Sequence, residues 1–191
     1  MSRRRAFRRA ALAAGGALTA ATAVGAADRL PAQPSRAGDE KALNLLLMID
    51  RAEVAFYTAA LEKAGLSGEL EEFAKTALGH EREHVSYLEG ALGKAAEKEA
   101  EYDFGDATAD ADAFARSAAK LEDVAVGAYN GQATNVTPGA FLAAARIVSV
   151  EARHAAWIRS IRDGDPAPDA VDTAYGEARV RRELRSLGVP A

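Results

Sequence analysis

The sequence predicts an all-α protein, built as a four-helix bundle with one long crossover between its second and third helices. Two observations support this prediction. Apolar residues recur every three or four positions over four long stretches, and no β-type alternation of useful length occurs. Short loops join the stretches in two pairs, and a longer charged segment separates the pairs. This order is typical of a bundle with a single crossover connection.

The first pair of predicted helices occupies residues 39–64 and 68–92. No glycine or proline interrupts residues 39–64. Gly65 ends this helix, and Ser67 can cap the next one. The apolar positions that define the two inward faces are Leu43, Leu46, Leu47, Ile49, Phe56, Ala60 and Leu61, followed by Leu70, Phe73, Ala77, Leu78, Leu88 and Leu92.

The second pair follows a charged, aperiodic segment at residues 94–109, which we interpret as the crossover. The third helix is predicted to begin near Asp110 or Asp112 and to end around residues 130–131. Thr137 is the expected N-cap of the fourth helix, predicted at residues 138–162, with Pro138 as its first residue. Gly164 stops this helix, and a short, highly charged fifth helix is predicted at residues 170–186.

Residues 1–27 are predicted to be an export signal. They contain five arginines and no acidic residue, and an uncharged run fills residues 10–27. The stretch Arg4-Arg5-Ala6-Phe7 resembles a twin-arginine signal, although Arg3 stands where Ser or Thr is usual. Small residues end the run and suit signal-peptidase cleavage; a retained membrane anchor is the alternative. Whether the signal is cleaved or retained, the sequence predicts a periplasmic, extracellular or envelope-associated protein. Residues 28–38, which follow the signal, are predicted to be a linker.

Composition limits the remaining possibilities. The chain of 191 residues is long enough for one ordinary domain, predicted at residues 39–163 and followed by a charged extension at 164–191. It has no cysteine, which excludes disulfides, thiolate metal sites, iron–sulfur clusters and cysteine nucleophiles. Beyond residue 27 it carries 19 basic and 28 acidic residues, a net charge of −9. This acidic balance argues against nucleic-acid binding, and no mature segment resembles a membrane span.

Six ionisable residues interrupt the apolar faces of the four long helices. An unpaired buried carboxylate is costly, and four converging carboxylates also repel one another. The sequence therefore predicts that a cation neutralises them. The six residues are Glu53, Glu81, His84, Glu122, Glu151 and His154.

The spacing of these residues indicates a repeated metal site. Glu81 and His84 are three positions apart, as are Glu151 and His154, so each pair points the same way from one helix. Glu53 precedes Glu122 by 69 residues, and each member of the first pair precedes its counterpart by 70. The two halves of the chain therefore repeat with their candidate ligands in register.

Three stretches carry a resemblance to a known superfamily: RAEVAFYTAALEKAG, GHEREHVSYL and LEDVAVGAYNGQA. With one Glu on each of two helices and Glu-x-x-His on each of the other two, the chain resembles the ferritin-like dinuclear carboxylate proteins over about residues 39–163. It looks most similar to exported ferritin-like domain proteins of bacteria. The resemblance implies that Glu53 and Glu122 are terminal ligands. By the same resemblance the paired glutamates bridge two metals, and each histidine completes one of them.

The resemblance implies two metal ions per chain. Two divalent ions would balance the four carboxylates, and oxygen-rich ligands with one imidazole each suit iron or manganese, although zinc would also bind. We expect iron first, and the implied partners are O₂ or peroxide. A homodimer is compatible with the sequence.

Other polar residues near the stripes have two interpretations each. Asp50 is either a hydrogen-bond partner of a ligand or a surface acid at the margin of the stripe. His80 is interpreted as a partly exposed structural histidine, with an outer partner or extra ligand as the alternative. Tyr57 and Tyr129 are interpreted as core packing, with the alternative that they line the site and donate a hydrogen bond or an electron. Trp157 is interpreted as packing.

The functional hypothesis is an exported di-metal protein, with iron as the first choice of metal, that acts as an oxidase or consumes peroxide. The main alternative is a non-enzymatic metal-binding or structural envelope protein. An iron-storage cage and a membrane quinol oxidase are less favoured. The charged extension is unlike a dedicated cage subunit, and no mature segment looks embedded in a membrane.

Overall fold

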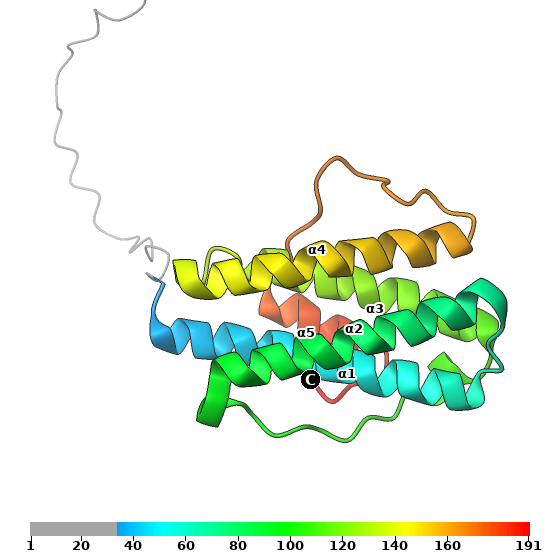
Figure 1. Cartoon of the computed structure of the whole chain (residues 1–191), viewed down its shortest axis with the longest axis horizontal. Helices are drawn as coiled ribbons and strands as arrows, with labels where there is room; N and C mark the ends of the chain where they lie inside the picture. The colour runs from blue at the N-terminus through cyan, green and yellow to red at the C-terminus, as the bar shows by residue number, and fades with distance from the viewer. Residues whose placement is uncertain (1–33) are drawn as a thin grey trace, which may run out of the picture. The chain divides into compact units, whose positions relative to one another are not determined.

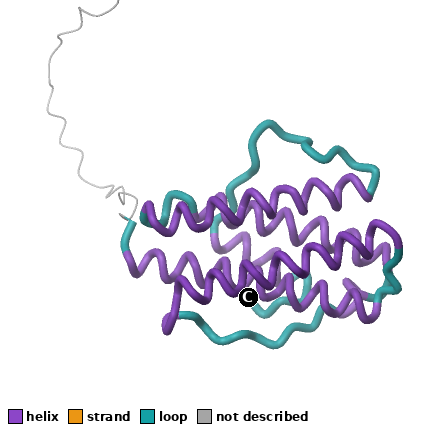
Figure 2. The backbone as a smooth tube through the Cα atoms, in the orientation of Figure 1, coloured by secondary structure: helices purple, strands orange, loops and turns teal. Residues whose placement is uncertain are grey.

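The computed structural model describes residues 34–191. The predicted signal at residues 1–27 lies outside the described residues, as does most of the predicted linker. Within the described part every regular element is helical (Figure 2), which confirms the all-α prediction. The long helices are α1 (Arg36–Lys63), α2 (Gly68–Leu92), α3 (Ala111–Gln132) and α4 (Pro138–Ile161), followed by the short helix α5 (Glu177–Arg185).

The four long helices form a bundle of two helical pairs. Helix α1 packs most extensively against α2, and α3 packs most extensively against α4 (Figure 1). Between the pairs, α1 contacts α3 and α2 contacts α4. The crossover from α2 to α3 runs along the outside of the bundle, as predicted. None of the helices within residues 34–191 combines the length and apolar character needed to cross a membrane.

Helix α1 begins at Arg36, so the predicted linker at residues 28–38 extends three residues too far. The reason is a cap at Ser35, whose hydroxyl accepts a hydrogen bond of 3.1 Å from the backbone N–H of Gly38. Thr137 is the N-cap residue of α4, as predicted, but it does not cap through its side chain. Its hydroxyl and its backbone N–H both donate to Asp39, at 2.7 Å each, which joins the starts of α1 and α4.

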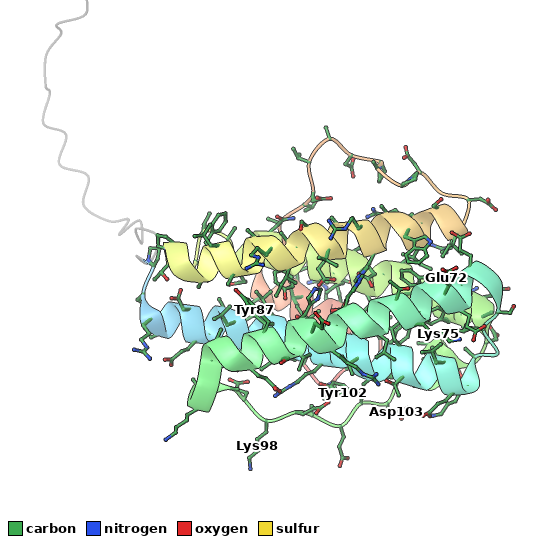
Figure 3. The ribbon with its side chains drawn as sticks, viewed as in Figure 1. Glu72, Lys75, Tyr87, Lys98, Tyr102 and Asp103 are labelled. Atoms are coloured by element: carbon green, nitrogen blue, oxygen red, sulfur yellow. The ribbon has the colours of Figure 1, made fainter. Side chains whose placement is uncertain are left out.

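The crossover is held against α1 by polar and aromatic contacts. It includes two 3₁₀ turns, Gly93–Ala95 and Gly105–Thr108. The amide of Asn44 donates to the carbonyl of Ala95 at 2.9 Å and accepts from the backbone N–H of Glu97 at 2.9 Å. Further along, Phe104 meets Phe56 edge-on, with ring centroids 5.3 Å apart. Lys98, Tyr102 and Asp103 mark the path of this segment in Figure 3.

Helix α5 begins at Glu177, later than the predicted start at residue 170. The preceding chain is extended because it passes directly over α3. The backbone N–H of Tyr175 donates to the carbonyl of Gly127 at 2.7 Å. A Cβ atom on Gly131, one turn further along α3, would lie 1.9 Å from the carbonyl oxygen of Tyr175. This approach requires glycine at residue 131, since any side chain would force the segment away.

Helix α5 covers part of the α1–α3 side of the bundle. Val180 and Leu184 are fully buried beneath it. At its start Glu177 pairs with Lys41 of α1 at 2.9 Å, and further along Glu183 pairs with Lys120 of α3 at 3.0 Å. The later part of the C-terminal extension is thus packed against the bundle, whereas residues 164–174 are exposed.

Candidate metal centre

The six residues predicted as metal ligands all lie inside the bundle. They come from all four long helices, which place them at the level where the two helical pairs meet. The four glutamates have no exposed surface, His154 is 2% exposed and His84 is 8% exposed. Their register along the helices follows from the spacings in the sequence, because residues three or four apart share one face of a helix.

The structure brings most of these residues into two groups. In each group, one ligand atom from every residue lies within 4.8 Å of the corresponding atoms of the others. Glu81 and Glu151 belong to both groups. One group adds His154 and Glu122, and the other adds His84 and Asp50. Glu53, the α1 residue predicted as a ligand, belongs to neither group, and Asp50 is the α1 residue in the His84 group.

Both histidines turn the same ring nitrogen toward the shared carboxylates. Nδ1 of His84 lies 3.0 Å from Glu81 and 2.9 Å from Glu151. Nδ1 of His154 lies 3.2 Å from Glu81, 3.6 Å from Glu122 and 3.7 Å from Glu151. Two imidazoles therefore face the same pair of carboxylates from opposite helices, an arrangement that can hold two ions side by side.

The buried polar atoms of this cluster lack partners. Eight buried side-chain nitrogen or oxygen atoms in residues 34–191 form no hydrogen bond of acceptable geometry, and all eight belong to these residues. Such atoms are rare in folded proteins because each one loses its hydration without compensation. A bound cation would satisfy them together. The eight atoms are Asp50 Oδ1, both oxygens of Glu53, Glu81 Oε1, Glu122 Oε2, both oxygens of Glu151 and His154 Nδ1.

Two tyrosines extend the cluster across the bundle. Both pack in the core as predicted, and both also donate hydrogen bonds to the cluster, which was the alternative interpretation. The hydroxyl of Tyr57 on α1 donates to Glu122 on α3, and the hydroxyl of Tyr129 on α3 donates to Asp50 on α1 at 2.8 Å. The two hydrogen bonds have the same antiparallel register. Asp50 and Tyr57 are seven residues apart on α1, and their partners Tyr129 and Glu122 are seven residues apart on α3 in the reverse order.

The internal repeat suggests why Glu53 has no hydrogen-bond partner. Its counterpart Glu122 accepts from Tyr57. The counterpart of Tyr57 in the repeat is Val126, since both follow their glutamate by four residues. A valine cannot donate a hydrogen bond, and both oxygens of Glu53 are left without one.

His80 is an outer partner of His154. Its Nδ1 lies 2.8 Å from Nε2 of His154, and the two rings are nearly coplanar, 8° apart. With Nε2 of His154 as the donor, Nδ1 of His154 keeps its lone pair for a metal. The letters from His80 to His84 also match the His-Glu-x-x-His pattern of zinc proteases. That pattern places both histidines on one ion, whereas His80 is outside both groups here.

The charges in the cluster shift its titration strongly. Burial, and then the neighbouring carboxylates, raise the pKa of Asp50 and of Glu53 well above the usual range. Burial also raises the pKa of Glu122, although His154 opposes this. For His154, burial favours the neutral ring, but the carboxylates around it outweigh burial and raise its pKa to about 12. Without metal, the cluster therefore retains protons at neutral pH.

One surface pocket reaches the cluster. It has a volume of about 240 Å³ and lies between α2 and α4, lined by Glu83, His84, Tyr87, Arg146 and Ile147. Tyr87 is 42% exposed on α2 (Figure 3). Because His84 belongs to one of the two groups, a small molecule in this pocket would be adjacent to that group alone.

Comparison with known families agrees with this geometry. The profile described as "Ferritin-like domain" matches residues 38–163, about two thirds of the chain. This chain belongs to the ferritin-like domain family. The match confirms the predicted resemblance and spans all four long helices of the bundle. No curated protein sequence matched the chain.

The ferritin-like domain of this chain fits metal binding on chemical grounds. Its buried carboxylate and imidazole clusters offer oxygen-rich donor sets with one imidazole each. Sequence reasoning left the role of Asp50 open and preferred packing over hydrogen bonding for the two tyrosines. The signal that would have identified them is the antiparallel register of α1 against α3, which depends on the fold. Trp157 does pack as predicted, edge-on against Phe73 at 5.4 Å.

Proposed function

We propose that this ferritin-like domain holds two metal ions in a dinuclear centre and oxidises Fe(II) or reacts with O₂ or peroxide. Iron is the first choice of metal, with manganese or zinc as alternatives. One observation carries the proposal: every buried side-chain polar atom without a partner in residues 34–191 belongs to one cluster. That cluster contains two groups, each with one histidine, which share Glu81 and Glu151.

The residues of the cluster have distinct tasks in this proposal. Glu81 and Glu151 face both positions, and His84 and His154 each complete one of them. His80 holds the ring of His154 in the tautomer that keeps Nδ1 free. Bound iron or manganese would supply one-electron chemistry toward oxygen species. Burial of all the carboxylates keeps bulk water away, and the pocket beside His84 gives small oxidants a route inward.

Metal content tests the proposal directly. The chain is purified without chelator after growth with iron and manganese, and metal per chain is measured by elemental analysis. We expect about two ions per chain, and none in a Glu81→Ala, Glu151→Ala double variant that keeps its helical circular dichroism. Glu72→Ala, an exposed position on α2 (Figure 3), is the matched control and should bind as the wild type does. Unchanged metal content in the double variant would refute the metal centre.

A structural role for the metal is the second candidate function. The two groups draw residues from all four long helices, so bound ions would join the two helical pairs without any turnover. This role predicts a large rise in melting temperature on metal addition and no consumption of O₂ or peroxide. Oxygen-electrode and peroxide assays on the metal-loaded chain separate the two roles, since only the redox role predicts consumption.

We also propose that the chain is exported, which rests on the sequence of residues 1–27 alone. The basic start, the uncharged run and the twin-arginine-like stretch support this proposal. Mass spectrometry of the protein recovered from its native host gives the N-terminus. Cleavage near Ala27 would support export with processing, an intact Met1 in the membrane fraction would support a retained anchor, and an intact soluble cytoplasmic chain would refute export.

A further inference from the structure

The two metal-capable groups differ in what α1 and α3 contribute. Helix α3 contributes Glu122 to the group of His154, as the internal repeat predicts. Helix α1 contributes Asp50 to the group of His84, although the repeat predicts Glu53. The repeat counterpart of Asp50 is Ala119, so this carboxylate has no equivalent in the second half of the chain.

The carboxylate of Asp50 is oriented in the same manner as that of Glu122. One oxygen of Glu122 accepts from Tyr57, and its other oxygen is buried without a partner. In Asp50, Oδ2 accepts from Tyr129 at 2.8 Å, and Oδ1 is buried without a partner. Each carboxylate thus has one oxygen fixed by a tyrosine of the opposite helix and one oxygen free. Neither oxygen of Glu53 is fixed in this way.

The surroundings of the two α1 carboxylates also differ. Asp50 is fully buried and interacts electrostatically with Glu151, Glu81 and His84. The carboxylates that surround Glu53 include Glu122, which belongs to the other group. The grouping of ligand atoms places Asp50 at the His84 position, and it places Glu53 at neither position.

We infer that Asp50 is the α1 ligand of a divalent first-row metal ion at the His84 position and that Tyr129 is its positioning residue. This inference rests on the proposed dinuclear centre. It makes the two positions chemically different: one is completed by an aspartate held by Tyr129, and the other by a glutamate held by Tyr57. It also gives the cluster five carboxylates in place of the four that the sequence predicts.

Anaerobic titration of the metal-free full chain with Mn(II), followed by equilibrium dialysis and elemental analysis, tests this assignment. We expect two ions on the wild type and one on Asp50→Asn, with the Kd of the lost ion raised at least 100-fold. Glu53→Gln removes the same charge one turn along α1 and should raise either Kd less than tenfold. Tyr129→Phe keeps Asp50 and should raise one Kd about 10–100-fold, as loss of an outer partner does. Glu72→Gln is the surface control.

Double variants locate the lost ion. Asp50→Asn combined with His84→Ala should still bind one ion, because both changes affect the same position. Asp50→Asn combined with His154→Ala should bind none. Two ions at wild-type Kd on Asp50→Asn would overturn the inference and leave the dinuclear centre intact, as would loss of an ion on Glu53→Gln alone. No Mn(II) on the wild type would overturn both the centre and the assignment. If Asp50→Asn loses its helical circular dichroism, Tyr129→Phe decides alone, and an unchanged Kd overturns the inference.

Discussion

Replacing Glu53 with methionine should stabilise the metal-free protein. Glu53 is fully buried, and neither of its oxygens has a hydrogen-bond partner. Methionine has a similar volume, forms helices well and adapts to irregular core sites. Replacement of buried ionisable groups by apolar residues of similar volume is often neutral or stabilising, by up to about 4 kcal/mol.

The size of the effect follows from proton linkage. Burial raises the pKa of Glu53 in the folded protein well above its unfolded value of about 4.3. Between these two pKa values the folded chain binds more protons than the unfolded chain, so this residue lowers stability more as the pH rises. Retaining the proton at pH 7 costs at most about 4 kcal/mol, and at pH 5 about 1 kcal/mol. The gain from Glu53→Met should therefore shrink as the pH falls.

Thermal unfolding followed by circular dichroism in chelator measures this gain. For a domain of this size, about 4 kcal/mol at pH 7 corresponds to a rise of roughly 8–16 °C in Tm. The rise at pH 5 should be roughly 2–4 °C. Glu72→Met, on the exposed face of α2, should change stability by no more than about 0.5 kcal/mol at either pH. A metal-free Glu53→Met protein that is no more stable than the wild type at pH 7 would refute the reasoning.

Three further predictions use the same protein. Burial raises the pKa values of Asp50 and Glu53, and the carboxylates raise those of His84 and His154, so the folded metal-free protein binds more protons than the unfolded chain. The Tm of the metal-free protein should therefore fall from pH 5 to pH 9. The rise in Tm on Mn(II) addition should grow over the same range, because the metal must displace those protons. A Tm that rises over this range in chelator would contradict this. His80→Phe should weaken Mn(II) binding about 10–100-fold in competition with a chromophoric chelator, and an unchanged Kd would remove His80 from the centre. Gly131→Ala should lower Tm and speed proteolysis within residues 165–176, because the added Cβ would meet the carbonyl of Tyr175. The control Gly139→Ala on α4 adds a Cβ that meets no other atom, and it should raise Tm slightly. Equal effects of the two substitutions would argue against the contact with Tyr175.

Helical periodicity and spacing were enough to predict the bundle and most of the cluster. The i, i+3 pairs placed both histidines beside the shared glutamates, because helix geometry alone fixes that relation. The bounds of α2 were predicted correctly. The start of α1 was predicted three residues too late, because the cap at Ser35 was not recognised. These features depend on local sequence, which a single chain contains in full.

What could not be predicted depends on how helices meet. The role of Asp50 stayed open because it stands at the margin of the stripe and has only Ala119 as its counterpart in the repeat. Tyr129 bonds a carboxylate 79 residues away, across two helices whose relative register no periodicity reveals. The late start of α5 depends on contact between Tyr175 and Gly127, which is again a tertiary contact overriding local helix propensity.

The division of the cluster between the two helical pairs affects how the protein is made. Helices α1 and α2 supply three residues of the His84 group but only Glu81 of the His154 group. Helices α3 and α4 supply three residues of the His154 group but only Glu151 of the His84 group. Neither position is therefore complete on a nascent chain until α4 has emerged from the ribosome and docked. Under the proposed dinuclear centre, full metal loading would therefore require α4. A chain truncated before Glu151 would carry three of the four residues of the His84 group and two of the four of the His154 group, so it could hold neither ion in full coordination.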